Sequence, residues 1–151
     1  METTHYRQFG IMLAISFVIM YIVMYFNADQ FSHVYLSLNR FYMTTLMVAP
    51  MALVMLGFMS AMYHNKKING IIIASSLALL IGVFLLLRHQ TLIDDKQYLR
   101  SMIPHHSSAI LVSEEAQLDD PEVQALAKQI IESQKKEIEQ MKAILARMKK
   151  E

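Results

Sequence analysis

Residues 71–87 read IIIASSLALLIGVFLLL, and no side chain in this run carries a charge. Two further uncharged apolar runs precede it, at residues 9–26 and 42–62. At 1.5 Å per helical residue, runs of this length approach or cross the hydrocarbon core of a bilayer, which is about 30 Å thick. Three such runs with charges only between them predict three transmembrane helices rather than the buried helices of a soluble protein.

The average composition hides a sharp division near residue 90. Hydrophobic residues make up 54% of the 151 residues, and the formal net charge is +1. Only seven charged side chains lie in residues 1–90, whereas residues 91–151 hold the other twenty. We therefore expect a three-helix transmembrane region at 1–90 and a charged, water-exposed region at 91–151. The small net charge argues against a nucleic-acid partner, and the absence of cysteine excludes disulfides and thiolate metal sites.

Basic residues indicate how the spans cross the membrane. Lys66 and Lys67 lie in the short connection between the second and third runs, and Arg7 lies on the same side. The positive-inside rule then predicts a cytoplasmic N-terminus in a bacterial inner membrane, with residues 91–151 in the periplasm. Arg88 and the basic residues after it favour the opposite orientation.

The charged region carries the signals of two helices. Asp94 or Asp95 is placed to cap a helix that runs to about residue 117, with Pro104 inside it as a kink. Asp120 caps a second helix that continues to about Lys149. Each helix has one apolar stripe, and two helices cannot enclose a core, so we predict an antiparallel hairpin that associates with other copies into a bundle. The stripes consist of Leu99, Met102, Ile103 and Ile110, and of Val123, Ala127, Ile130, Ile138, Met141, Leu145 and Met148.

The sharpest local motif is Met102-Ile103-Pro104-His105-His106. Adjacent histidines on a helix point about 100° apart, and Met102 falls angularly between them. Imidazole nitrogen and thioether sulfur suit Cu(I) and Cu(II), and silver is expected to follow Cu(I) in its preference for soft sulfur. We predict Met102, His105 and His106 as metal ligands, with zinc ranked below copper and silver. Alternatively, the histidines are polar surface or interface groups and Met102 fills the core.

The second helix adds two candidate ligands, Glu137 and Met141. In helical projection Glu137 falls within the apolar seam close to Met141. A carboxylate on a buried seam needs a partner, because an unpaired buried charge costs several kcal/mol. That partner could be a metal ion, a lysine or a protonated His105 or His106. We expect a His/His/Met/Glu/Met set within or between chains; the alternative is a Glu–His hydrogen bond that holds an oligomer together.

Methionines also recur at steps of four in the second apolar run, at Met43, Met47, Met51, Met55 and Met59. Stacked thioethers could pass a soft monovalent ion. Methionine is also an adaptable filler between helices, and we interpret the stripe as packing.

Residues 95–145 resemble the domain of unknown function family 305. The matching residues are Asp95, Tyr98, Met102-Ile103-Pro104-His105-His106, Ala109-Ile110, Asp120-Pro121-Glu122, Gln134, Glu137-Ile138 and Met141. The three spans are similar to the membrane-anchored subgroup of that family. The resemblance implies a ferritin-like helical bundle, which longer members form from two hairpins, and an association with copper or silver handling. Many members have a methionine where this chain has Val112, so a site here would be poorer in sulfur.

These observations predict an all-α protein, with three transmembrane helices followed by a hairpin that completes a ferritin-like bundle by oligomerisation. The predicted function is membrane-anchored, non-enzymatic binding of copper or silver in metal homeostasis or resistance. The lipid bilayer and further copies are its expected partners, together with a periplasmic metal-handling protein. The second hypothesis is a structural oligomer or accessory subunit of a membrane complex without a metal role.

Overall fold

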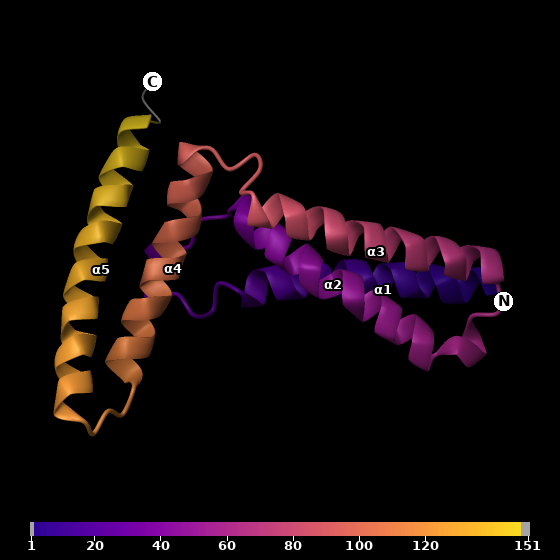
Figure 1. The fold of residues 1–151 in the computed structure, drawn as a ribbon, viewed down its shortest axis with the longest axis horizontal. Helices are drawn as coiled ribbons and strands as arrows, with labels where there is room; N and C mark the ends of the chain where they lie inside the picture. The colour runs from indigo at the N-terminus through magenta and orange to yellow at the C-terminus, as the bar shows by residue number, and fades with distance from the viewer. Residues whose placement is uncertain (1, 149–151) are drawn as a thin grey trace. The chain divides into compact units, whose positions relative to one another are not determined.

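The computed structural model describes residues 2–148, and all regular structure within them is helical (Figure 1). The α-helices are α1 (Glu2–Val23), α2 (Leu38–Phe58), α3 (Lys66–Arg88), α4 (Asp95–Glu115) and α5 (Pro121–Met148). Two short 3-10 turns, η1 (Phe31–His33) and η2 (Ser60–Met62), complete the set. The expectation of an all-α protein is therefore confirmed.

The chain divides into two compact units. The first contains Val23 and the residues before it, together with Asn39–Leu92. The second contains Met24–Leu38, which connects α1 to α2, and the residues from Ile93 onward. The composition change near residue 90 thus lies close to a structural boundary, but composition gave no sign that residues 24–38 pack with the hairpin.

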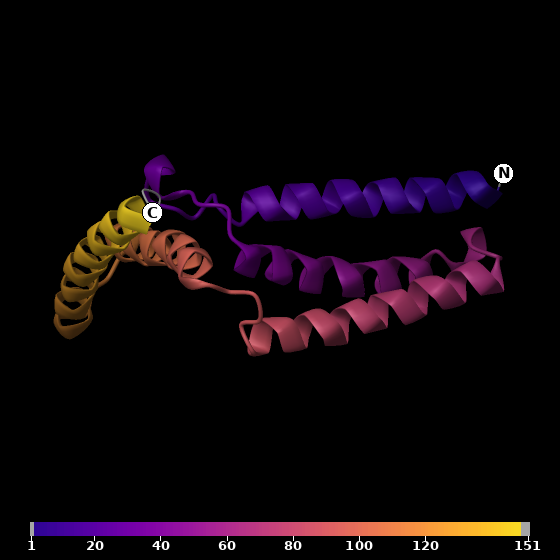
Figure 2. The same cartoon turned by 90° about the horizontal axis from the view of Figure 1, so that it is seen from above.

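The first unit consists of helices that are long and apolar enough to cross a membrane. The candidate spans are Thr4–Val23, Leu38–Phe58 and Lys66–Arg88, and successive helices run in opposite directions (Figures 1 and 2). Few side chains are buried in the spans of α1 and α3, about 6% in each, whereas 28% are buried in the span of α2. The predicted runs are confirmed as helices with shifted ends: α1 ends at Val23 rather than residue 26, and α2 ends at Phe58 rather than residue 62.

Hydrogen bonds link the start of α1 to the turn between α2 and α3. Asn65 caps α3, because its side-chain oxygen accepts hydrogen bonds from the first-turn amides of Lys67 and Ile68. The hydroxyl of Tyr6, from α1, donates to the Asn69 side-chain oxygen at 2.7 Å. It also accepts from the amide of Asn65 at 3.2 Å. These bonds tie the start of α1 to the start of α3.

In the second unit, α4 and α5 form an antiparallel hairpin (Figure 1). Asp94 caps α4 and Asp120 caps α5, as predicted, with carboxylates that accept first-turn amides at 2.7 and 2.8 Å. Pro104 lies inside α4, which continues through it, and its side chain is fully buried. The predicted end of the second helix near Lys149 lies outside the described residues.

The hairpin core lies along the facing stripes of the two helices. Its buried members are Leu99, Ile103, Ile110, Ile138, Met141 and Leu145. Full burial of an aliphatic side chain stabilises by about 1.5–3 kcal/mol, so this cluster is the main reason the helices pair. Val123 was predicted to belong to the stripe, but it is 45% exposed because it lies in the first turn of α5, beside the connection.

The connecting segment 24–38 is the third component of the second unit. The backbone amide of Asp29 donates to the hydroxyl of Ser107 at 2.8 Å, and Nδ1 of His33 lies 2.9 Å from the same hydroxyl. Further along the segment, the amide of Leu38 donates to the side-chain oxygen of Gln97 at 2.9 Å. Both Ser107 and Gln97 belong to α4, so α4 packs against this segment as well as against α5.

Candidate functional site

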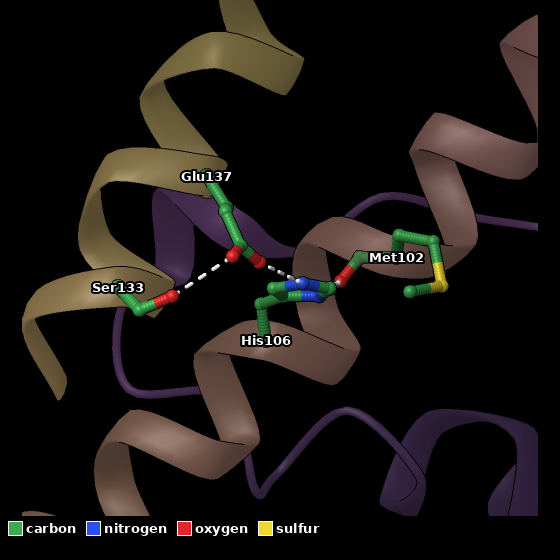
Figure 3. Close-up of polar contacts among 4 residues, drawn as sticks. All are labelled: Met102, His106, Ser133 and Glu137. Carbon is green, nitrogen blue, oxygen red and sulfur yellow. Dashed lines mark hydrogen bonds and ion pairs between the residues drawn. The ribbon is translucent and has the colours of Figure 1, made fainter. Parts of the chain in front are cut away.

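The candidate site is centred on His106, which α4 presents toward α5. Its side chain is 12% exposed, and Nε2 lies 2.7 Å from Oε2 of Glu137 on α5 (Figure 3). On the other side of the ring, Nδ1 lies 2.9 Å from the backbone carbonyl oxygen of Met102. Both ring nitrogens are therefore held by oxygen atoms of the same hairpin.

The chemistry of these oxygens fixes the proton on Nδ1. A carbonyl oxygen can only accept a hydrogen bond, so Nδ1 of His106 carries a proton and donates to Met102. An ionised carboxylate also only accepts, so the contact with Glu137 is complete when Nε2 is protonated as well. If Nε2 instead gives up its proton, its lone pair points at Glu137. The pair can thus act as an ion pair or offer a nitrogen and an oxygen ligand to a cation.

Ser133 completes the environment of Glu137. Its hydroxyl donates to Oε1 of Glu137 at 2.8 Å, one helical turn away on α5 (Figure 3). This hydrogen bond, followed by the one from His106, lowers the pKa of Glu137 below its ordinary value of 4.5. Glu137 is therefore ionised at neutral pH. We had not singled out Ser133 from the sequence, although its spacing of four residues from Glu137 is a usable signal.

The expected burial of Glu137 in the apolar seam is wrong. Its side chain is 47% exposed, and the neighbouring Ile138, which is 1% exposed, takes the central position. Successive residues on a helix are about 100° apart, so the placement of Ile138 at the centre turns Glu137 to the edge of the interface. His106 meets it at that edge.

The other predicted ligands lie around this pair without joining it. The exposed His105 has its ring centroid 6.0 Å from that of His106. Met141 is 9% exposed and belongs to the hairpin core, against which Met102 also packs. Figure 3 shows the thioether of Met102 extending away from the His106–Glu137 contact. Within residues 2–148 there is no group of three or more histidine, cysteine, aspartate or glutamate side chains that could hold a metal ion.

A second polar cluster surrounds His33, which is only 5% exposed. Burial is the main cause that lowers its pKa below 6.5, and Lys142 adds to the effect, whereas Asp29 and Glu139 oppose it. The ring borders a hollow of about 250 Å³, which is lined by Asp29, Gln30, His33, Ile110, Lys135, Ile138 and Glu139. The contact between His33 and Ser107 places this cluster one residue from His106 along α4.

The methionines of α2 do not share one environment. Met43 and Met47 are 42% and 47% exposed, whereas Met55, and Met59 just after the end of the helix, pack against the core of the first unit. This division agrees with lipid-facing and packing roles along one drifting stripe.

Comparison with known proteins agrees with the motif. The model of the family described as Domain of unknown function (DUF305) matches residues 87–148, which include all of α4 and α5. The chain is 38% identical over 138 residues to uncharacterized protein L153 of Acanthamoeba polyphaga mimivirus, and the match covers 89% of each chain. No solved structure matches the chain. The chain therefore belongs to the DUF305 family.

Proposed function

We propose that the protein is a membrane-anchored, non-enzymatic binder of copper or silver ions, with the site on the α4–α5 hairpin. The observation that carries the proposal is the fixed ring of His106. Its Nδ1 donates to a backbone carbonyl and its Nε2 faces a carboxylate. A metal-ligating histidine is usually oriented in this way, with one nitrogen held by a carbonyl or carboxylate and the other directed at the ion.

The ligand set is built outward from the His106–Glu137 pair. Two donors hold an ion weakly, and the neighbouring imidazole is that of His105, which is exposed and on the same turn. Met102 and Met141 can supply sulfur only after their side chains leave the core contacts that they make. We propose that His105 of a second copy completes the site, within a ferritin-like bundle formed by several hairpins.

The membrane part of the proposal rests on the three spans and on their flanking charges. Lys66 and Lys67 begin α3, and Arg7 lies near the start of α1. We propose a bacterial inner membrane with these residues in the cytoplasm and the hairpin in the periplasm, where a metal-handling partner could receive the ion. Protease treatment of spheroplasts tests this orientation, because a periplasmic hairpin is cleaved while the membrane is intact.

Metal binding by the purified full-length chain tests the proposed function. We expect stoichiometric binding of Cu(I), Cu(II) or Ag(I), and at least tenfold weaker binding in His106→Ala and Glu137→Gln. Glu139→Gln is the matched control, because Glu139 lies on the same helix with its side chain 75% exposed, paired with Lys142. Failure of the wild-type chain to bind copper or silver above a 1:10 metal-to-chain ratio would overturn the proposal, and preferential binding of Zn(II) would reassign the metal.

A structural role is the alternative, and one observation favours it. The 2.7 Å contact between His106 and Glu137 joins α4 to α5 without any ion. If this contact only holds the bundle together, His106→Ala loses the oligomer in crosslinking experiments, and added copper changes neither variant nor wild type. If the metal proposal holds, the oligomer survives in His106→Ala and only metal binding is lost.

A further inference from the structure

The connecting segment 24–38 carries a concentration of exposed apolar side chains. Phe26, Phe31 and Leu36 are 74%, 92% and 66% exposed. Other residues of the segment are buried: Tyr25, His33 and Ser37 are 7%, 5% and 4% exposed. The segment therefore has an inner side and an outer side, and the three large apolar side chains share the outer side with the exposed polar residues Asn27, Gln30 and Ser32.

Hydrogen bonds hold the inner side in place. The Asp29 amide and the ring of His33 both reach the buried hydroxyl of Ser107, and the side-chain amide of Asn27 donates to Ser108 at 2.8 Å. The outward side chains are thus displayed by a restrained backbone. Three large apolar side chains held exposed on one short, restrained segment make that segment a candidate interaction surface.

Chain connectivity indicates which partner this surface meets. The segment continues into the candidate spans at Val23 and Leu38. At no more than about 3.5 Å per residue, Phe26 and Leu36 lie within roughly 10 Å of the span ends. The headgroup layer is on the order of 5–8 Å thick on each side of the hydrocarbon, so both side chains lie in or next to that layer.

The charge of the segment agrees with a lipid partner. Asp29 is its single charged residue, and it has no lysine or arginine. The segment therefore has no basic group to attract an anionic protein or nucleic acid. Aromatic and aliphatic side chains at the end of a span are instead typical of contact with the boundary between headgroups and acyl chains.

We infer that segment 24–38 docks on the membrane surface, with Phe26, Phe31 and Leu36 inserted at the boundary between headgroups and acyl chains. The inference rests on the proposal that α1 and α2 span a membrane. The hydrogen bonds to Ser107 and Ser108 then fasten α4, and with it the adjacent His106, to a lipid-bound segment.

Tryptophan fluorescence tests this docking, because the chain contains no tryptophan. Full-length Phe31→Trp is reconstituted into phosphatidylcholine vesicles with or without brominated acyl chains. We expect a blue-shifted emission that the brominated lipid quenches at least twofold. Leu126→Trp is the control, because Leu126 is 54% exposed on α5, and we expect less than 20% quenching there. Phe31 is 92% exposed, so its replacement leaves the packing of the second unit unchanged.

A third variant separates failure of the docking from failure of the membrane proposal. Phe84 lies on α3 and is 54% exposed, so Phe84→Trp reports whether that helix is in the bilayer. Quenching at position 84 without quenching at position 31 would overturn the docking and leave the spans standing. Quenching at neither position would overturn both. A blue shift at position 31 without quenching would assign the surface to contact with protein and also overturn the docking.

Discussion

Replacement of Ser107 by alanine tests the attachment of segment 24–38 to α4. Ser107 is fully buried, and its hydroxyl bonds both the Asp29 amide and Nδ1 of His33. Ser107→Ala leaves two donors or acceptors without partners, each of which costs about 1–3 kcal/mol when buried. The higher helix propensity of alanine returns about 0.5 kcal/mol. We therefore expect the attachment to weaken by about 1.5–5.5 kcal/mol.

The neighbouring Ser108 provides a matched control. Its hydroxyl accepts one hydrogen bond, from the exposed side chain of Asn27, so water can replace that bond. We expect Ser108→Ala to weaken the attachment by no more than about 1 kcal/mol. The helix, the residue type and the substitution are the same in both variants, so the difference between them isolates burial and the second bond.

Hydrogen exchange of the full-length chain measures this effect directly. Because 1.4 kcal/mol corresponds to a factor of ten, a loss of 2 kcal/mol speeds exchange of peptide 24–38 by roughly 30-fold in Ser107→Ala. Peptides from α3 should exchange at the wild-type rate. Our reasoning is refuted if exchange in Ser107→Ala stays within threefold of wild type, or if Ser108→Ala accelerates it equally.

Three further predictions concern the hairpin core, the connection between α3 and α4, and the pH dependence of stability. We expect Ile138→Ala to lower the stability of the hairpin by about 2–5 kcal/mol in denaturant titration. The control Leu126→Ala removes an exposed side chain and should cost less than about 1 kcal/mol. Equal losses in the two variants would contradict the assigned core. Leu92 has a φ of 63°, in the left-handed region that a β-branched residue disfavours. We expect Leu92→Val to lower the stability of the protein by about 1–2 kcal/mol and Leu92→Gly to leave it unchanged. A valine variant as stable as wild type would disprove the left-handed conformation. Because the pKa of His33 is lowered from 6.5, the unfolded chain binds more protons just below pH 6.5. Stability should therefore fall as the pH drops from 6.5 through the lowered value, and His33→Gln should flatten this part of the pH profile of thermal unfolding.

The helices could be predicted because their signals are local. Each uncharged run forms a helix, with shifted ends, and Asp94 and Asp120 each cap the helix that follows them. The end of α1 was misplaced because residues 24–26 are apolar and continue the run. The structure uses Tyr25, which is 7% exposed, in the second unit instead. Hydropathy cannot distinguish a lipid-facing residue from one that packs just outside the span.

The attachment of segment 24–38 could not be predicted, because it depends on single contacts between distant residues. Asp29 and His33 meet Ser107 across more than 70 positions of sequence. No repeating sequence pattern accompanies these bonds. One of them is donated by a backbone amide, a group that every residue except proline has, so the residue type at position 29 does not indicate it.

Helical projection placed Glu137 at the wrong depth, and it left the partner of Glu137 open among a metal ion, a lysine, His105 and His106, of which the structure shows His106. A projection sorts residues in steps of about 100°, so it cannot decide whether Glu137 or the adjacent Ile138 occupies the centre of the interface. It also treats Met102 as a side chain, whereas the structure uses its backbone carbonyl. Any residue at position 102 supplies that carbonyl, so the orientation of the ring does not explain why a methionine is there.

The edge position of Glu137 decides whether the pair can accept an ion. Metal–ligand bonds to imidazole nitrogen and carboxylate oxygen are about 2.0–2.2 Å long, so an ion between His106 and Glu137 needs a nitrogen–oxygen separation of roughly 3–4 Å. The observed separation is 2.7 Å, and one side chain must therefore move by about an ångström. His106 is held on both sides and nearly buried, but Glu137 is half exposed on a flexible stem. The Glu137 side chain can therefore rotate into water and make room for an ion that it then binds. A carboxylate buried at the centre of the seam could not move away from His106, and no ion could enter between the two side chains.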